Sequence, residues 1–166
     1  MDIIVAACQN WAIGNHGELL YHIPDDLKRF RNMTTGKVVV YGRKTLETFP
    51  YGLALPNRTN VILSRNSELS VPDATVISNL TALRNYLLQF NTDDIFIIGG
   101  AQIYAQLLEH CKSAYVTRIL ATPDEATAYF PNLDEDPRWD CVETGPLLNY
   151  DDIDYQFCRY TNRVVY

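Results

Sequence analysis

The sequence has few of the residues that build metal sites or disulfide frameworks. Its 166 residues include 4 cysteines and 3 histidines, none at the spacing of a metal finger or a redox pair. The cysteines are far apart in the chain: Cys8, Cys111, Cys141 and Cys158. We expect no metal in this protein, and free thiols that lie mostly in the core of a cytoplasmic protein.

Long apolar segments and an excess of positive charge are absent as well. No apolar run approaches the roughly 20 residues of a membrane-spanning helix, and residues 1–8 lack the cationic start of a signal peptide. The net charge of −6 leaves no broad basic surface for nucleic acid or acidic membranes. The length suits one domain over 1–166, and without an apolar heptad we expect a monomer.

The chain does contain a regular alternation of strand-like and helix-like segments. Continuous, mostly β-branched runs predict strands at 3–8, 37–41, 60–64, 75–77, 94–98 and 114–119. Helices are expected between them at 25–33, 43–49, 80–90 and 101–111. This pattern predicts an α/β domain with a central, mostly parallel sheet and flanking helices. Two last runs, 139–144 and 154–165, predict a C-terminal antiparallel hairpin at the sheet edge.

Asp26 is the most informative residue of the first expected helix. Helical residues turn by about 100° each, so Asp26 falls near Phe30 and Met33 on the apolar side, while Asp25 points toward solvent. A carboxylate in apolar surroundings is costly unless a cation or a hydrogen-bond donor meets it. This position favours a polar ligand or a proton-transfer role. The alternative is that Asp26 caps the helix and favours its positive end.

Several strand ends carry residues that suit an anionic ligand. Apolar strands end at residues 42–45 (Gly-Arg-Lys-Thr), at Ser64 and Arg65, and at Gly99-Gly100. Free amides at a helix start and nearby cations bind phosphate, and glycines let the backbone approach a ligand. Each segment alone is also explained as an ordinary turn, and Gly99-Gly100 lacks the GxGxxG spacing. Together they favour a phosphorylated cofactor.

Two further segments suit a ligand but also have ordinary explanations. The connection over 15–24 is long, and loops after the carboxyl end of a strand commonly build ligand sites. It is otherwise a plain surface connection. Arg58 follows an apolar stretch and could clamp a substrate carboxylate through two hydrogen bonds. It is otherwise a surface arginine.

Taken in order, these segments resemble the dihydrofolate reductase family of the bacterial type. The similarity runs from Ile3 to about Pro131, and the expected hairpin fits the family topology. Its motifs are Ala6-Ala7 with Ile13-Gly14, residues 23–30, 42–45 and 55–58, residues 98–100 with Tyr104, and residues 115–119. The resemblance implies NADPH-dependent reduction of 7,8-dihydrofolate to 5,6,7,8-tetrahydrofolate, by hydride transfer to C6 and protonation of N5, for one-carbon metabolism. It also implies binding of antifolate-type molecules.

The resemblance implies a role for each matching residue. Asp26 would bind the pteridine with support from Thr117, and Tyr21 and Leu19 would complete the catalytic group. Arg58 would pair with the glutamate tail. The other substrate contacts would be Val5, Ala6, Leu27, Phe30, Phe49, Leu55, Ile98 and Tyr104. The cofactor contacts would be Ala6, Ala7, Ile13, Gly14, Leu19, Gly42, Arg43, Lys44, Thr45, Leu63, Ser64, Arg65, Ile98, Gly99, Gly100, Ala101, Gln102, Ile103 and Tyr104. In the family the Gly-Gly bond is cis.

Three positions depart from the family pattern. Tyr21 stands in place of a tryptophan, and Leu20 in place of a proline, so we expect altered tuning of the carboxylate and a looser loop. Thr127 replaces an aspartate that hydrogen-bonds the mobile loop in its closed form, so the resemblance does not establish gating of the loop by that contact. Burial should raise the pKa of Asp26, and hydrogen bonds to its ionised form should oppose the rise.

Two other functions stay open at this point. A related reductase, such as the reductase domain of riboflavin biosynthesis, shares this fold, although Asp26 and Arg58 favour folate. A non-catalytic nucleotide-binding module would bind NADPH without oxidising it. Absorbance at 340 nm with NADPH and dihydrofolate separates these possibilities.

Overall fold

A computed structural model describes residues 1–165 and has a nine-stranded sheet at its centre. The strands of this sheet are β1 (Asp2–Cys8), β3 (Val38–Gly42), β4 (Thr59–Leu63), β5 (Ala74–Ile77), β6 (Ile95–Gly99), β7 (Ser113–Ile119), β9 (Trp139–Thr144), β10 (Leu148–Tyr150) and β11 (Ile153–Asn162). Their order is β10-β11-β7-β1-β6-β3-β4-β5, and β9 also pairs with β11. The pairs from β7 to β5 are parallel, and β11 runs antiparallel to its partners. The predicted α/β fold class is confirmed.

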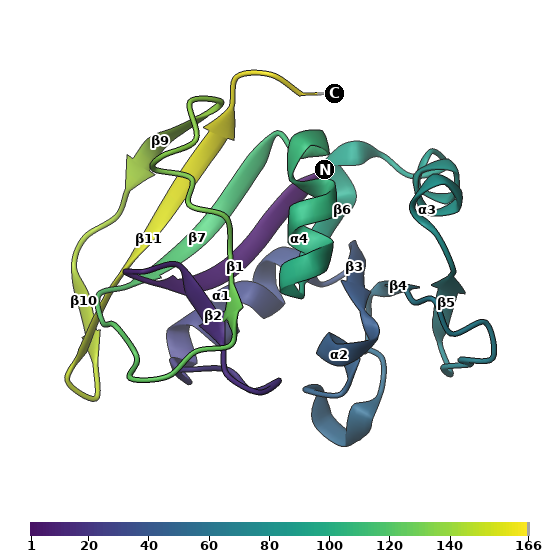
Figure 1. Ribbon diagram of the computed structural model, residues 1–166, viewed down its shortest axis with the longest axis horizontal. Coiled ribbons are helices and arrows are strands. Elements are labelled where there is room, and N and C mark those ends of the chain that lie inside the picture. The colour runs from purple at the N-terminus through teal and green to yellow at the C-terminus, as the bar shows by residue number, and fades with distance from the viewer. Residues whose placement is uncertain (166) are drawn as a thin grey trace.

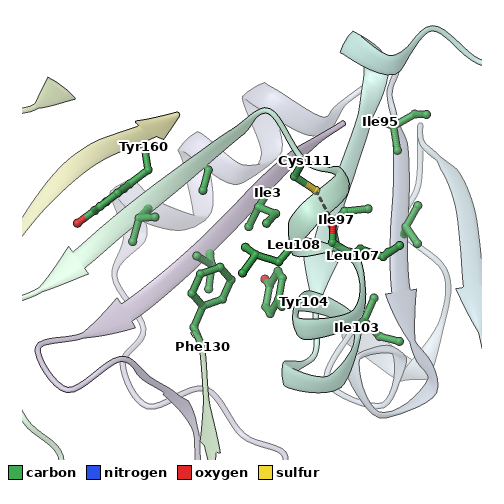
Figure 2. Close-up of a cluster of buried hydrophobic side chains, with 14 of the residues drawn as sticks. Ile3, Ile95, Ile97, Ile103, Tyr104, Leu107, Leu108, Cys111, Phe130 and Tyr160 are labelled. Atoms are coloured by element: carbon green, nitrogen blue, oxygen red, sulfur yellow. Dashed lines mark hydrogen bonds between the residues drawn. The ribbon is translucent and has the colours of Figure 1, made fainter. Parts of the chain in front are cut away.

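Helices cover both faces of the sheet (Figure 1). They are α1 (Pro24–Thr34), α2 (Arg43–Leu46), α3 (Leu80–Leu87) and α4 (Ala101–Leu107). Successive strand residues point to opposite faces. Ile3 and Val5 therefore pack with α3 and α4, whereas Ile4 packs in a second core with Phe30 and Met33 of α1. Figure 2 shows how the first core forms, with side chains of α4 lying between β1 and β6 and beside Phe130.

The predicted C-terminal antiparallel pair is confirmed, but only one of its two strands lies at the edge of the sheet. The predicted pair exists as β9 and β11, but β11 lies inside the sheet beside β7, so the edge belongs to β9 and β10. The unpredicted β10 forms a tight hairpin with β11. Its turn residues Asp151 and Asp152 have φ of 50° and 62°, the paired positive values of a two-residue hairpin turn.

Other differences concern short elements. The predicted helices 43–49, 80–90 and 101–111 end earlier, and the last continues as a 3-10 turn at Leu108–His110. The short strands β2 (Ala12–Gly14) and β8 (Ala128–Tyr129) pair with each other outside the main sheet and were not predicted. All four cysteines are free, and three of them are buried as expected, with Cys141 exposed.

The sheet opens between β1 and β6. The chain leaves β1 through α1 toward β3, and leaves β6 through α4 toward β7, so the two connections run in opposite directions. The two strands pair only at Asp2 and Ile3, opposite Phe96 and Ile97, and their carboxyl ends separate. In parallel α/β sheets, ligands bind in the crevice at such a switch point. This crevice positions the site.

Candidate active site

A carboxylate and a hydroxyl meet beside this crevice, next to strand β1. The Thr117 hydroxyl on β7 donates a 2.5 Å hydrogen bond to Oδ1 of Asp26, near the start of α1. Asp26 is half-buried, whereas the exposed Asp25 accepts a 3.0 Å bond from the Tyr155 hydroxyl. The residue preceding α1 is Ile23, and no side chain caps the helix. Asp26 therefore does not cap the helix, although it lies in the first turn, where a negative charge favours the positive end of α1. Its predicted inward orientation is confirmed.

Opposing influences act on the proton of Asp26. Burial raises the pKa of this carboxyl group, while the Thr117 hydrogen bond and the positive charge of Arg29 oppose the rise. The direction matches the sequence-based expectation. Burial thus makes the neutral form of Asp26 easier to reach than in a free carboxyl group, which suits a residue that holds or moves a proton.

The floor of the crevice is a small residue beside this pair. Ala6 on β1 lies opposite Thr117 in the strand pairing, and it is the one position of β1 that is not fully buried. Ala6 also lines a small cavity with Ile13, Leu19 and Tyr21. The structure thus brings together residues predicted for the nicotinamide side of the site and the predicted catalytic Tyr21.

Apolar side chains form the wall next to Asp26. The half-buried Phe30, Phe49 and Leu55 pack on the second core, and the Phe49 ring meets the Tyr41 ring at 5.1 Å. Leu27 keeps 48% of its surface exposed on α1, so its side chain is accessible to a ligand. This wall suits a flat, apolar ring system.

Three predicted contact residues are buried beneath the crevice surface. Val5 and Tyr104 belong to the first core, and Ile98 to the second. The Tyr104 hydroxyl donates to the carbonyl oxygen of Ile4 at 2.8 Å. These side chains support the strands that border the crevice.

Arg58 is held in a fixed orientation at the end of the apolar wall. Its Nε donates to the Thr34 hydroxyl at 3.2 Å, and its Nη1 donates to the Pro56 carbonyl at 2.8 Å. Across residues 1–165 no carboxylate lies within ion-pair distance of Arg58. Burial lowers its pKa, with Arg31 adding to the effect, but a guanidinium stays charged. This cation is available for an anionic group of a ligand.

Asn60 supports the loop that carries Arg58, and the sequence did not reveal it. The buried Asn60 accepts a bond from the Leu55 amide at 3.0 Å and donates to the Leu55 carbonyl at 2.8 Å. A buried side-chain amide needs hydrogen-bond partners. An asparagine inside an apolar strand therefore indicates that it binds a neighbouring segment, and this was the signal in the sequence for the positioning role of Asn60.

The predicted phosphate-binding segments lie side by side. Gly42 pairs with Leu63, and Tyr41 with Gly99, so the ends of β6, β3 and β4 are neighbours. The Gly99-Gly100 bond is cis, as the resemblance implied. Gly99 has φ of 145°, and a Cβ there would lie 2.9 Å from the Thr45 hydroxyl. This turn therefore needs glycine and leaves its backbone open to a close ligand.

The cations at this end are placed in different ways. Lys44 and Arg65 are exposed, and Ser64 is buried with its hydroxyl accepting from the Asn66 amide at 3.2 Å. Arg43 forms an exposed 2.6 Å ion pair with Glu47. Exposed ion pairs contribute little to stability, so a phosphate can take the place of Glu47 beside Arg43. The residues present fit a phosphorylated dinucleotide.

The mouth of the crevice includes residues that the sequence did not reveal. A cavity of about 390 Å³ is lined by Gly17, Glu18, Leu19, His22, Glu47 and Thr48. Glu47 and Thr48 were expected inside a helix, which concealed their position at the end of α2. This cavity lies between the loop 15–23 and the residues that follow α2.

Thr127 also contacts this loop. Its hydroxyl accepts a 2.7 Å hydrogen bond from the His16 amide, and its own amide donates to the Gly14 carbonyl at 3.0 Å. The position that lacks the family's aspartate therefore still accepts a hydrogen bond from the loop.

Taken together, the split sheet, the phosphate-type turns and the half-buried carboxylate beside an apolar wall define an α/β reductase that uses a phosphorylated nucleotide cofactor. Comparison with known proteins identifies which one. The sequence pattern of the family described as dihydrofolate reductase matches residues 1–162.

Individual relatives are similar over most or nearly all of the chain. The dihydrofolate reductase of Bacillus subtilis (strain 168) is 32% identical over 165 residues, which cover 98% of this chain and 95% of the relative. That of Haemophilus influenzae is 35% identical over 160 residues, covering 96% and 94%. Dihydrofolate reductase type A13 of Escherichia coli is 35% identical over 131 residues, covering 79% and 77%.

The chain belongs to the dihydrofolate reductase family. Its activity is the reduction of 7,8-dihydrofolate to tetrahydrofolate, its cofactor is NADPH, and family members bind dihydrofolate and antifolates. This match favours the folate reaction over the riboflavin-type reductase and the non-catalytic module. Among residues 1–165, no helix is both long and apolar enough to cross a membrane.

Proposed function

We propose that Asp26 is the central residue of dihydrofolate reduction in this chain. The observation that carries the proposal is the half-buried carboxylate, held by Thr117 beside the open position at Ala6. When ionised, it accepts hydrogen bonds from the amino group and ring nitrogen of the pterin. The negative charge then stabilises the positive charge that the pterin gains when N5 takes up its proton. Leu19 and Tyr21 border the same space, and Tyr21 orients water near the carboxylate.

The other residues bind and align the two reactants. The apolar wall of Leu27, Phe30, Phe49 and Leu55 holds the pterin and benzoyl rings, and Arg58 pairs with the glutamate carboxylate. NADPH, when bound, supplies the hydride from C4 of its nicotinamide. Arg43, Ser64 and Arg65 surround its 2′-phosphate, and the Gly99-Gly100 turn with Lys44 and Thr45 holds its pyrophosphate. The enzyme gains most of its rate by fixing the two rings in contact and excluding water.

The variant Asp26→Asn tests this assignment. We expect it to fold and to bind NADPH like wild type, but to lose turnover at neutral pH by about 100-fold or more, because the negative charge is gone. The measurement is NADPH oxidation at 340 nm with dihydrofolate, with NADPH affinity from fluorescence quenching. Asp25→Asn is the matched control, since it removes a neighbouring charge outside the crevice. Wild-type turnover in Asp26→Asn would refute the role.

We further propose that this protein works as a cytoplasmic, single-domain monomer without a metal and without nucleic acid. The net charge of −6 supports the lack of a nucleic-acid partner. A mass of about 19.0 kDa in sedimentation or light scattering is the expected result, and a mass twice as large would contradict it.

A further inference from the structure

Arg29 is a charged residue of α1 that lies against the sheet. It follows Asp26 by three residues, so the two side chains share one side of the helix. Its guanidinium carbon lies 4.5 Å from the ring centre of Phe157 and 5.8 Å from that of Tyr115. Phe157 on β11 is directly opposite Thr117 on β7. The site of the guanidinium therefore adjoins the hydroxyl that binds Asp26. In Figure 1, α1 lies behind these strands.

The Arg29 guanidinium lacks some of the hydrogen-bond and ion-pair partners that a charged group usually has. Its Nη1 is buried and has no hydrogen-bond partner among the described residues, and no carboxylate within residues 1–165 lies at ion-pair distance from it. Two aromatic faces provide a cation–π environment. A half-buried cation with an unpartnered nitrogen and no bound anion is unfavourable for folding. A residue kept at such a cost is a candidate for function.

The groups that act electrostatically on Arg29 come from four elements. They are Asp26 on α1, Tyr115 on β7, Cys158 on β11 and Glu143 on β9, and Asp26 has the largest effect of these on its charge. Glu143 is exposed and already accepts a 2.7 Å bond from Arg159. The carboxylate that feels Arg29 most directly is therefore Asp26.

The groups that face Asp26 are mostly neutral. Thr117 from β7 donates its hydrogen bond, and the phenols of Tyr104 on α4 and Tyr155 on β11 are close enough for Asp26 to raise their pKa. Tyrosine phenols keep their protons at neutral pH. Arg29 is the permanent positive charge that acts on Asp26.

We propose that Arg29 is a positioning residue for the reaction, a fixed positive charge beneath Asp26 that sets the pH range in which the carboxylate and the bound pterin share a proton. This inference rests on the proposed role of Asp26. The direction of the shift in the pH profile does not depend on whether Asp26 or the pterin holds the proton, because a nearby cation disfavours protonation of both. Removing the cation makes protonation easier, so activity that requires the proton persists to higher pH.

Single-turnover hydride transfer measured from about pH 5 to 9 with saturating NADPH and dihydrofolate tests the proposal. For Arg29→Met we expect the apparent pKa of the profile to rise by about 0.5–1 unit, which makes the variant about three- to tenfold faster at the alkaline end. Arg29→Lys keeps the charge and should follow wild type. Lys28→Met removes a charge from the exposed side of the same helix and should leave the profile in place. A profile of Arg29→Met that coincides with wild type, or an equal shift in Arg29→Lys, would overturn the proposal.

A second measurement does not depend on turnover. The side-chain carboxyl signal of Asp26, assigned by comparison with Asp26→Asn, is titrated by carbon NMR in the free protein. We expect its pKa to rise in Arg29→Met, and in Arg29→Gln if the methionine variant does not fold. An unchanged titration would refute the coupling. If Asp26→Asn keeps full turnover while the titration shifts, the role of Asp26 fails but the electrostatic coupling stands.

Discussion

The hydroxyl of Thr117 fixes the carboxylate on which the chemistry is centred. Helical periodicity alone places Asp26 on the inner side of its helix, and the structure confirms this. Thr117 came only from the family resemblance, because a threonine in a buried strand looks like any β-branched residue. Arg29 was missed because a cation on an amphipathic helix is usually solvated. In a helical projection Arg29 falls between the inward Met33 and the outward Asp25, and this border position was the sign in the sequence that Arg29 could lie against the sheet.

Replacing Thr117 tests the value of its hydrogen bond. Thr117→Val keeps the shape but removes the donor, so the ionised form of Asp26 loses a partner and its pKa rises further. A hydrogen bond to a charged group contributes about 1.5–3 kcal/mol, and we expect dihydrofolate affinity at neutral pH to fall about tenfold, because the carboxylate that binds the pterin is no longer held in place. Thr117→Ser keeps the hydroxyl and should stay close to wild type in the 340 nm assay. Equal losses in both variants would assign the effect to packing.

Among the connections, the long segment after β1 is the least regular, yet its first part is attached to the segment after β7 at several points. The β2–β8 pair and the Thr127–His16 hydrogen bond connect this loop to the segment after β7. Periodicity predicts the long buried strands well. Strands of two or three residues such as β8 and β10 show no period, and they form only because distant segments are brought together.

Thr127→Val tests the contact between the loop and this segment. We expect its stability to stay near that of wild type, because the lost hydrogen bond is exposed, but NADPH to bind a few-fold more weakly because the loop is less ordered. Stopped-flow NADPH binding gives the affinity, and urea unfolding gives the stability. Thr127→Ser, which keeps the acceptor, is the control. The loop contact has no role if valine and serine bind NADPH equally well.

In the molecule as a whole, the crevice arises from the strand order. The alternation of strands and helices predicts a parallel sheet, and glycines and cations at strand ends predict a phosphate site, both without tertiary information. Strand order is different, because it is decided by long-range pairing that no local pattern encodes. The insertion of β11 beside β7, which brings Phe157 to Thr117, was therefore not foreseen. The proposed effect of Arg29 depends on this insertion.

A functional carboxylate in this crevice should lower the stability of the whole protein. Burial raises the pKa of Asp26 in the folded chain above its ordinary value of 3.8. As pH rises through that value the unfolded chain loses the proton first, so the free energy of unfolding decreases until pH exceeds the folded pKa.

Asp26→Asn removes this penalty at the cost of activity. We expect the variant to be more stable than wild type by about 1 kcal/mol at pH 7, with a gap that closes as pH falls toward 4. Urea unfolding at both pH values measures it, with Glu135→Gln as a control that neutralises an exposed carboxylate. A gap that is the same at both pH values would show that the amide stabilises the fold by packing and that the Asp26 charge costs it nothing.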